Sequence, residues 1–358
     1  MAEHVLLDLA AIIILGIGAQ WLAWRLRMPS ILFLLLFGFL AGPITGFLHT
    51  DALMGDLLLP FVSLSVGVIL FEGSLTLNIK EFREIGNVVL SLITIGMLVT
   101  WAVASAAAYF LLGLNPGISI LLGSILVVTG PTVIGPLLRH IKPKGKVADI
   151  LKWEGIVIDP VGALFAVLVF EGVMVGGLQD ASTQILMNLG KTVLFGGLTG
   201  IFFATVLTIF LKNFWLPDYL EETGTLALVV FAYIVSDMLQ HESGLFATTL
   251  MGIIMANQRF VSIKHILEFK ENLSVLIIST LFIILSSRLD ISVFSHISAG
   301  SLIFLVILIF IARPLSVVLS TARSKLNWRE KAFLSWMAPR GIVAASVASI
   351  FALRLNET

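Results

Sequence analysis

Residues 153–171 read WEGIVIDPVGALFAVLVFE, an apolar run that carries two carboxylates, Glu154 and Asp159, in its first half. The run approaches the roughly 20 residues that an α-helix needs to cross a bilayer. A carboxylate at bilayer depth costs roughly 3 kcal/mol or more unless a cation, a proton or a base neutralises it, so such groups are rare where they serve no purpose. The stretch therefore predicts a membrane-spanning helix that contains an ion or proton site.

The composition of the whole chain leads to the same class of protein. The 358 residues are 58% hydrophobic and only 12% charged, with a mean hydropathy of +1.05. These values are typical of an all-α, multi-pass integral membrane protein. Acidic and basic residues balance at 22 each, which predicts no nucleic-acid partner. The absence of cysteine excludes disulfides and thiolate chemistry.

About twelve apolar runs are long enough to be membrane spans. They are residues 5–24, 30–48, 57–74, 87–112, 117–138, 153–176, 189–212, 224–239, 243–258, 273–288, 299–320 and 332–354. Most Lys and Arg residues lie in the loops after the first, third, fifth, ninth and eleventh runs. The positive-inside rule makes these loops cytoplasmic, places the N-terminus outside, and fits a bacterial inner (plasma) membrane.

Two of these runs are expected to be broken helices. The fifth is interrupted at Thr129-Gly130-Pro131, and the twelfth at Pro339-Arg340-Gly341. Pro removes a backbone donor and Gly weakens a helix, so carbonyls and amides are freed in the middle of the membrane. One such break alone is also compatible with a simple proline kink. Two breaks in corresponding halves predict a transporter built from inverted repeats, with the binding site where the broken helices cross.

The two carboxylates of the sixth run are expected to have different functions. Five positions separate them by about 140° around a helix, so Glu154 and Asp159 do not both face one ion. Asp159 lies deeper in the span, among apolar and small residues. Burial disfavours the unpaired charged form, so this carboxyl should accept either a proton or a metal cation. The alternative is an Asp that caps a helix or satisfies stray amides.

Arg313 stands inside the eleventh run and needs a counter-ion there, because arginine stays protonated. Glu154 is the candidate partner for a structural ion pair that leaves Asp159 free. Arg340 in the broken twelfth run competes for the same partner. For Arg340 the alternative is a cation that binds the C-terminal carbonyls of a half-helix. The sequence alone leaves the choice open.

Several segments resemble, in order, the signatures of a known family. They are residues 27–43 (RMPSILFLLLFGFLAGP), 68–80 (VILFEGSLTLNIK) and 243–257 (SGLFATTLMGIIMAN), the fifth and sixth runs with their basic loop, Ala312-Arg313-Pro314, and Pro339-Arg340-Gly341. Together they resemble the monovalent cation:proton antiporter superfamily, and most nearly the NhaP-type sodium/proton exchangers. The resemblance extends through nearly the whole chain.

The resemblance implies a homodimer whose protomer has thirteen spans, divided between a dimerisation domain and a moving core domain. On this chain the core would comprise residues of about 87–176 and 299–354, and the scaffold about 1–74 and 189–288. It also implies that Asp159 binds the ion together with Thr129 of the broken helix, and that Glu154 pairs with Arg313. No resident cofactor is implied.

The chain departs from the family pattern at three places. Gly130 and Ile158 stand where relatives usually carry acidic or amide side chains. Asp159, Thr129, freed carbonyls and water would then have to hold the cation, which predicts weaker binding and favours a larger ion such as K⁺. A thirteenth span is also missing, which suggests a truncated chain that lacks its last span and any cytoplasmic regulatory domain.

The resulting hypothesis is a secondary antiporter that exchanges Na⁺ or K⁺ for H⁺ by alternating access at Asp159, with one proton per cation. One alternative is a sodium-coupled symporter for organic solutes, which would need a polar pocket where this chain has aliphatic residues. A gated cation channel is the other alternative. An enzyme is not expected, because no acid, base and nucleophile converge in the sequence.

Overall fold

The computed structural model describes residues 2–130, 133–134, 137–138, 141, 143, 145–174, 178–292, 297–337, 344, 348 and 351. Within these residues the chain forms helices and connections, without a strand. The helices are α1 (Ala2–Leu26), α2 (Ser30–Phe39), α3 (Thr50–Met54), α4 (Leu58–Ser74), α5 (Ile79–Ser91), α6 (Met97–Leu112), α7 (Pro116–Ile125), α9 (Lys146–Met174), α10 (Leu178–Lys212), α11 (Asp218–Leu239), α12 (Ser243–Asn257), α13 (Lys264–Ser287), α15 (Ala299–Ile307), α16 (Arg313–Ser320) and α17 (Trp328–Trp336).

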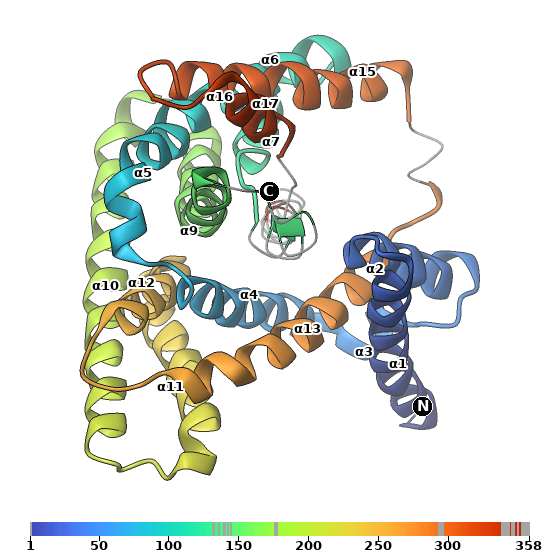
Figure 1. The fold of residues 1–358 in the computed structure, drawn as a ribbon. Helices are drawn as coiled ribbons and strands as arrows, with labels where there is room; N and C mark the ends of the chain where they lie inside the picture. Colours follow the sequence, from blue (N-terminus) through green and yellow to red (C-terminus); the bar gives the residue numbers. More distant parts are fainter. Residues whose placement is uncertain are drawn as a thin grey trace.

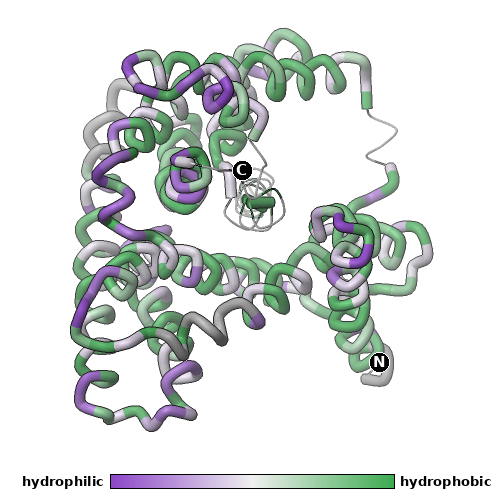
Figure 2. The backbone as a smooth tube through the Cα atoms, in the orientation of Figure 1, coloured by the Kyte–Doolittle hydropathy of each residue, from purple (hydrophilic) through white to green (hydrophobic). Residues whose placement is uncertain are grey.

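The predicted all-α, multi-pass architecture is confirmed. Every apolar run of the sequence overlaps one of these helices. In the described chain, seven segments are long and apolar enough to cross a membrane, and shorter apolar helices accompany them. The tube is hydrophobic along most helices, and hydrophilic residues gather mainly at helix ends and connections (Figure 2). Large apolar side chains such as Trp24 and Phe110 are exposed on the outside, as expected for a lipid-facing surface.

Three segments of π-helix interrupt the α-helical spans, at Leu40–Ile44, Leu92–Gly96 and Leu308–Ala312. A π turn inserts one residue into the hydrogen-bond ladder and rotates the rest of the helix about its axis, and such turns are frequent at functional sites. Hydropathy and periodicity did not predict them. The third segment ends immediately before Arg313 and therefore sets the direction in which that side chain leaves its helix.

The helices pack in two groups (Figure 1). The first helix group contains α1, α2, α4 and α10 to α13, and the second contains α5, α6, α7, α9 and α15 to α17. Small residues allow close packing inside a group. A Cβ atom on Gly42 would come within 2.2 Å of the Ser287 carbonyl oxygen, so only glycine permits this approach of the π turn after α2 to the end of α13.

Helix α9 joins the two groups. It packs on α5 and α7 of the second group and also touches α4, α10 and α12 of the first. In Figure 1, α9 is drawn end-on, with α5 and α7 beside it. A charge carried by α9 is therefore held where the two helix groups meet.

Candidate functional site

Asp159 lies on the face of α9 that packs against the interrupted fifth span. Gly155, Asp159 and Gly162 follow one another at intervals of four and three residues, which places them on one side of a helix. A Cβ atom on Gly155 would come within 2.6 Å of Ile134, and one on Gly162 within 2.7 Å of Val128. The two glycines thus bring the α9 backbone close to the interruption, and Asp159 stands between them.

The interruption begins where α7 ends at Ile125. Leu126 and Val127 form a turn, and the chain through Thr129 and Gly130 has no regular hydrogen-bonded structure. The Gly130 carbonyl accepts from the amides of Val133 and Ile134, which starts the next helical segment. This local arrangement agrees with the sequence, because Gly130 precedes a proline and that position disfavours the α conformation.

Polar atoms without partners gather on both sides of this contact. Asp159 has 0% of its surface exposed, and both its carboxyl oxygens are buried without a hydrogen-bond partner among the described residues. The buried hydroxyl of Thr129 also lacks a partner there. Pro160 has no amide, so the Ile156 carbonyl loses the donor that a regular helix would supply. Carboxylate, hydroxyl and carbonyl oxygens are the ligands that hard cations prefer.

The second carboxylate of α9 is fully engaged. Arg313 donates from Nη1 to Oε1 of Glu154 at 2.5 Å and from Nη2 to Oε2 at 2.9 Å, while its Nε donates to the Leu334 carbonyl at 3.1 Å. Both side chains are buried, with 3% of Glu154 and 6% of Arg313 exposed. A two-pronged pair of this kind is the geometry in which a carboxylate and a guanidinium bind most strongly. Glu154 is therefore neutralised, whereas Asp159 has no base beside it in the described structure.

The other predicted site residues lie outside the described residues. They are Pro131 in the first interruption, and Pro339, Arg340 and Gly341 in the second. Within the described part of the chain, no three His, Asp or Glu side chains come together in a group suited to a resident metal ion. A cation at Asp159 would thus have a single fixed carboxylate as its counter-charge.

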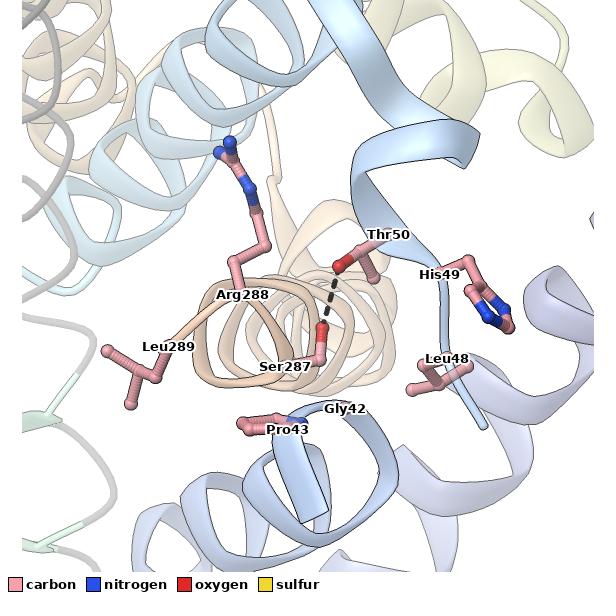
Figure 3. A pocket seen from close by; sticks show the side chains of 8 residues that line it. All are labelled: Gly42, Pro43, Leu48, His49, Thr50, Ser287, Arg288 and Leu289. Carbon is pink, nitrogen blue, oxygen red and sulfur yellow. Dashed lines mark hydrogen bonds between the residues drawn. The ribbon is translucent and has the colours of Figure 1, made fainter. Parts of the chain in front are cut away.

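A cavity of about 370 Å³ lies elsewhere, between the π turn after α2, the start of α3 and the end of α13 (Figure 3). The hydroxyls of Thr50 and Ser287 form a hydrogen bond of 3.0 Å in its wall. The ionisable residues in its lining are His49 and Arg288, both bases. This cavity lacks an acidic group to attract a cation, so it does not compete with Asp159 as a cation site.

Comparison with known proteins adds independent findings. The family described as sodium/hydrogen exchanger, transmembrane, matches residues 9–357. The Na⁺/H⁺ antiporter 1 of Methanocaldococcus jannaschii is 26% identical over 351 residues, which cover 94% of this chain and 80% of that protein. The K⁺/H⁺ antiporter NhaP of Alkalimonas amylolytica is 26% identical over 350 residues, covering 96% of this chain and 59% of that longer protein.

A solved structure has the same fold. The sodium proton antiporter MjNhaP1 from Methanocaldococcus jannaschii at pH 8 matches with a TM-score of 0.82 and 22% sequence identity. The match covers 99% of this chain and 88% of that one.

Sequence reasoning missed several parts of the site. It did not identify the packing roles of Gly155 and Gly162, although two glycines seven residues apart around a buried acid are a readable signal. It also missed the Leu334 carbonyl as the third acceptor of Arg313. No side chain signals that contact, because it depends on where α17 ends.

Proposed function

This chain belongs to the sodium/hydrogen exchanger family, and on that premise we propose that it exchanges a monovalent cation for a proton by alternating access at Asp159. The observation that carries the proposal is the pair of buried, partnerless carboxyl oxygens of Asp159. A buried charge without a partner is costly, so the carboxyl is expected to hold a proton or a metal cation. The unpartnered Thr129 hydroxyl beside the interruption would supply a further oxygen.

Competition for one carboxyl couples the two fluxes. When Asp159 binds a cation it must release its proton, and when a proton returns the cation must leave. Glu154 and Arg313 neutralise each other in their ion pair. Asp159 is then the group that changes charge during transport. One proton would then move for each cation, so exchange would be electroneutral.

The substrate is Na⁺ or K⁺. Both hard ions need several oxygen ligands, and this chain offers few fixed ones: Asp159, the Thr129 hydroxyl and freed backbone carbonyls, completed by water. Such a set binds weakly, which suits a transporter that must release its cargo. With Gly130 and Ile158 at positions where relatives usually carry further oxygen ligands, we expect the chain to tolerate the larger K⁺.

Alternating access requires the helices around Asp159 to move, because none of its surface is exposed in this conformation. We assign the movement to the second helix group, as the core domain, and dimer formation to the first, as the scaffold. The orientation expected from the positive-inside rule places the N-terminus outside.

The test is cation/proton exchange in proteoliposomes that contain a pH-sensitive dye. Asp159→Asn keeps the side-chain volume but removes the ionisable carboxyl. The variant can therefore neither take up and release a proton nor offer a negative charge to a cation. We expect the parent protein to respond to added Na⁺ or K⁺, and the variant to lose exchange by at least about 100-fold, because it lacks the coupling group. Equal dye responses from the two proteins would refute the assignment.

A further inference from the structure

The connection between α4 and α5 is one place where the chain passes from the first helix group to the second. It spans residues 75–78, between the end of α4 at Ser74 and the start of α5 at Ile79. Leu75 is buried in the apolar cluster that contains Phe71 and Met251 of the first group. Leu77, with 0% of its surface exposed, is buried in the cluster that contains Ile150 of α9. The boundary between the two groups thus passes through this connection.

Asn257, the last residue of α12, holds the connection from the side of the first group. Its Oδ1 accepts from the Ile79 amide at 2.8 Å, and its Nδ2 donates to the Leu77 carbonyl at 2.8 Å. The same Nδ2 donates to the carbonyl of Ile253 in its own helix at 2.7 Å, which fixes the orientation of the carboxamide. One side chain therefore joins α12 to the connection and the first turn of α5, through both the oxygen and the nitrogen of its carboxamide.

Lys152 of α9 holds the same connection from the side of the second group. Its Nζ donates to the Thr76 carbonyl at 3.1 Å and to Oε2 of Glu81 at 3.2 Å. Asn257 thus reaches from the first group to backbone of the connection and of α5, while Lys152 ties the connection to α5 and α9 within the second group. The two contacts meet on a connection of only four residues, which restricts how α5 can move relative to α12.

Helix α12 is itself tightly seated on α4. A Cβ atom on Gly252 would come within 2.5 Å of the Phe71 carbonyl oxygen, so the two helices are in backbone contact just before the connection begins. Asn257 is therefore attached to a closely packed part of the first group. A side chain mounted on such a helix and bound to two backbone groups is suited to serve as a fixed point.

We propose that Asn257 is a positioning residue that forms the pivot about which the second helix group moves relative to the first during transport. The role of Asn257 in transport rests on the proposed function, whereas its hydrogen bonds to Leu77 and Ile79 are a feature of the fold. The printed partners of the Asn257 side chain are backbone groups of Leu77, Ile79 and Ile253, so its loss should slow the conformational change without altering cation binding at Asp159. A defect in folding alone would also lower the maximal rate at unchanged KM, so the rates are compared per folded transporter and the distance measurement below separates the two roles.

The transport test compares Asn257→Ala with Gln258→Ala in proteoliposomes. Gln258 is the matched control, because among the described residues its carboxamide binds only Phe260 and Val261, in its own loop. We expect Asn257→Ala to lower the maximal exchange rate about tenfold, as two hydrogen bonds across the boundary are lost, and to leave the KM for the cation within about twofold. Gln258→Ala should change neither quantity by more than about twofold.

Asn257→Asp serves as a second variant of unchanged shape should the alanine variant fold poorly. It keeps the acceptor for the Ile79 amide but puts a carboxylate oxygen against the Leu77 and Ile253 carbonyls, which it repels, so a rate as low as that of the alanine variant is expected. Rates for Asn257→Ala and Asn257→Asp that match Gln258→Ala would overturn the proposal. A rise in KM equal to the fall in rate would also overturn it, because it would place Asn257 in cation binding.

A distance measurement tests the pivot without relying on transport. The chain contains no cysteine, so spin labels can be placed on cysteines introduced at Arg83 of α5 and at the exposed Tyr219 of α11 in the first group. We expect the narrow label-to-label distance distribution of the parent to broaden in Asn257→Ala and to stay narrow in Gln258→Ala. Unchanged widths would refute the pivot even if exchange is found, whereas broadening in a protein that exchanges no cation would refute only the proposed function.

Discussion

At the scale of single residues, the ion pair of Glu154 and Arg313 should matter more for folding than for charge transfer. Glu154→Gln leaves the buried guanidinium without its counter-charge, and removal of one partner of a buried pair costs about 3–5 kcal/mol. We expect a much lower melting temperature and folded yield, measured by thermal unfolding in detergent. Glu154→Gln combined with Arg313→Met should recover part of the loss, because no buried charge is then left alone.

Glu171 is the matched control on the same helix. Its carboxylate accepts from the Asn188 side chain at 3.2 Å, is only partly buried, and lies near the end of α9. Glu171→Gln retains an acceptor for that bond, so we expect the melting temperature to change little. If Glu154→Gln proves as mild as Glu171→Gln, the pair does not stabilise the fold.

The sequence predicted the chemical types at this site better than their pairing. A lone arginine within an apolar span signals that a carboxylate must be near, but both Arg313 and Arg340 met that description. Which base approaches Glu154 depends on the π turn at Leu308–Ala312, which rotates Arg313 towards α9. That turn depends on the backbone hydrogen-bond pattern, and the hydropathy of the sequence does not predict it.

At the scale of secondary-structure elements, the contact between α9 and the interruption should control cation binding. Gly162→Ala would place a methyl group 2.7 Å from Val128, next to Thr129, and a short branched side chain can move away only slightly. Overpacking of this kind costs about 1–3 kcal/mol. We expect a several-fold rise in the KM for the cation, measured by dye-monitored exchange, because the interruption that carries Thr129 is pushed away from α9.

Gly190→Ala tests whether the effect comes from contact rather than from helix propensity. A Cβ atom on Gly190 of α10 would have no neighbouring atom within 4 Å, so the added methyl group meets open space. Alanine there should leave exchange unchanged and stabilise the helix slightly. Equal KM values for the two variants would show that the contact at Gly162 is not part of the site.

Element boundaries were predictable where composition changes and less so where it does not. The fifth run was expected to break at Thr129-Gly130-Pro131, and α7 already ends at Ile125. The residues between are mostly β-branched or aliphatic, so hydropathy continues through a stretch that is no longer helical. The contacts of Asn257 were equally invisible, because a polar residue at the end of an apolar helix is ordinary.

At the scale of the whole molecule, the two helix groups meet through different kinds of contact in different places. Val128, Ala163 and Phe170 of the second group share one apolar cluster with Leu70 and Leu245 of the first. Apolar side chains can slide past one another at little cost in energy, because their contacts depend weakly on orientation. The hydrogen bonds of Asn257 and Lys152, in contrast, weaken steeply when their angles change. This division favours a movement that slides over the apolar surface and pivots at the polar connection.

Such a movement should carry no net charge if Asp159 alternates between one proton and one cation. We therefore expect the exchange rate in proteoliposomes to be the same with and without a membrane potential imposed by a thiocyanate gradient. The ion pair of Glu154 and Arg313 would then move as a neutral unit and contribute nothing to the charge displaced. A rate that rises at one polarity and falls at the other would mean that a second group binds a proton or cation during the cycle, and one-for-one exchange at Asp159 would then be wrong.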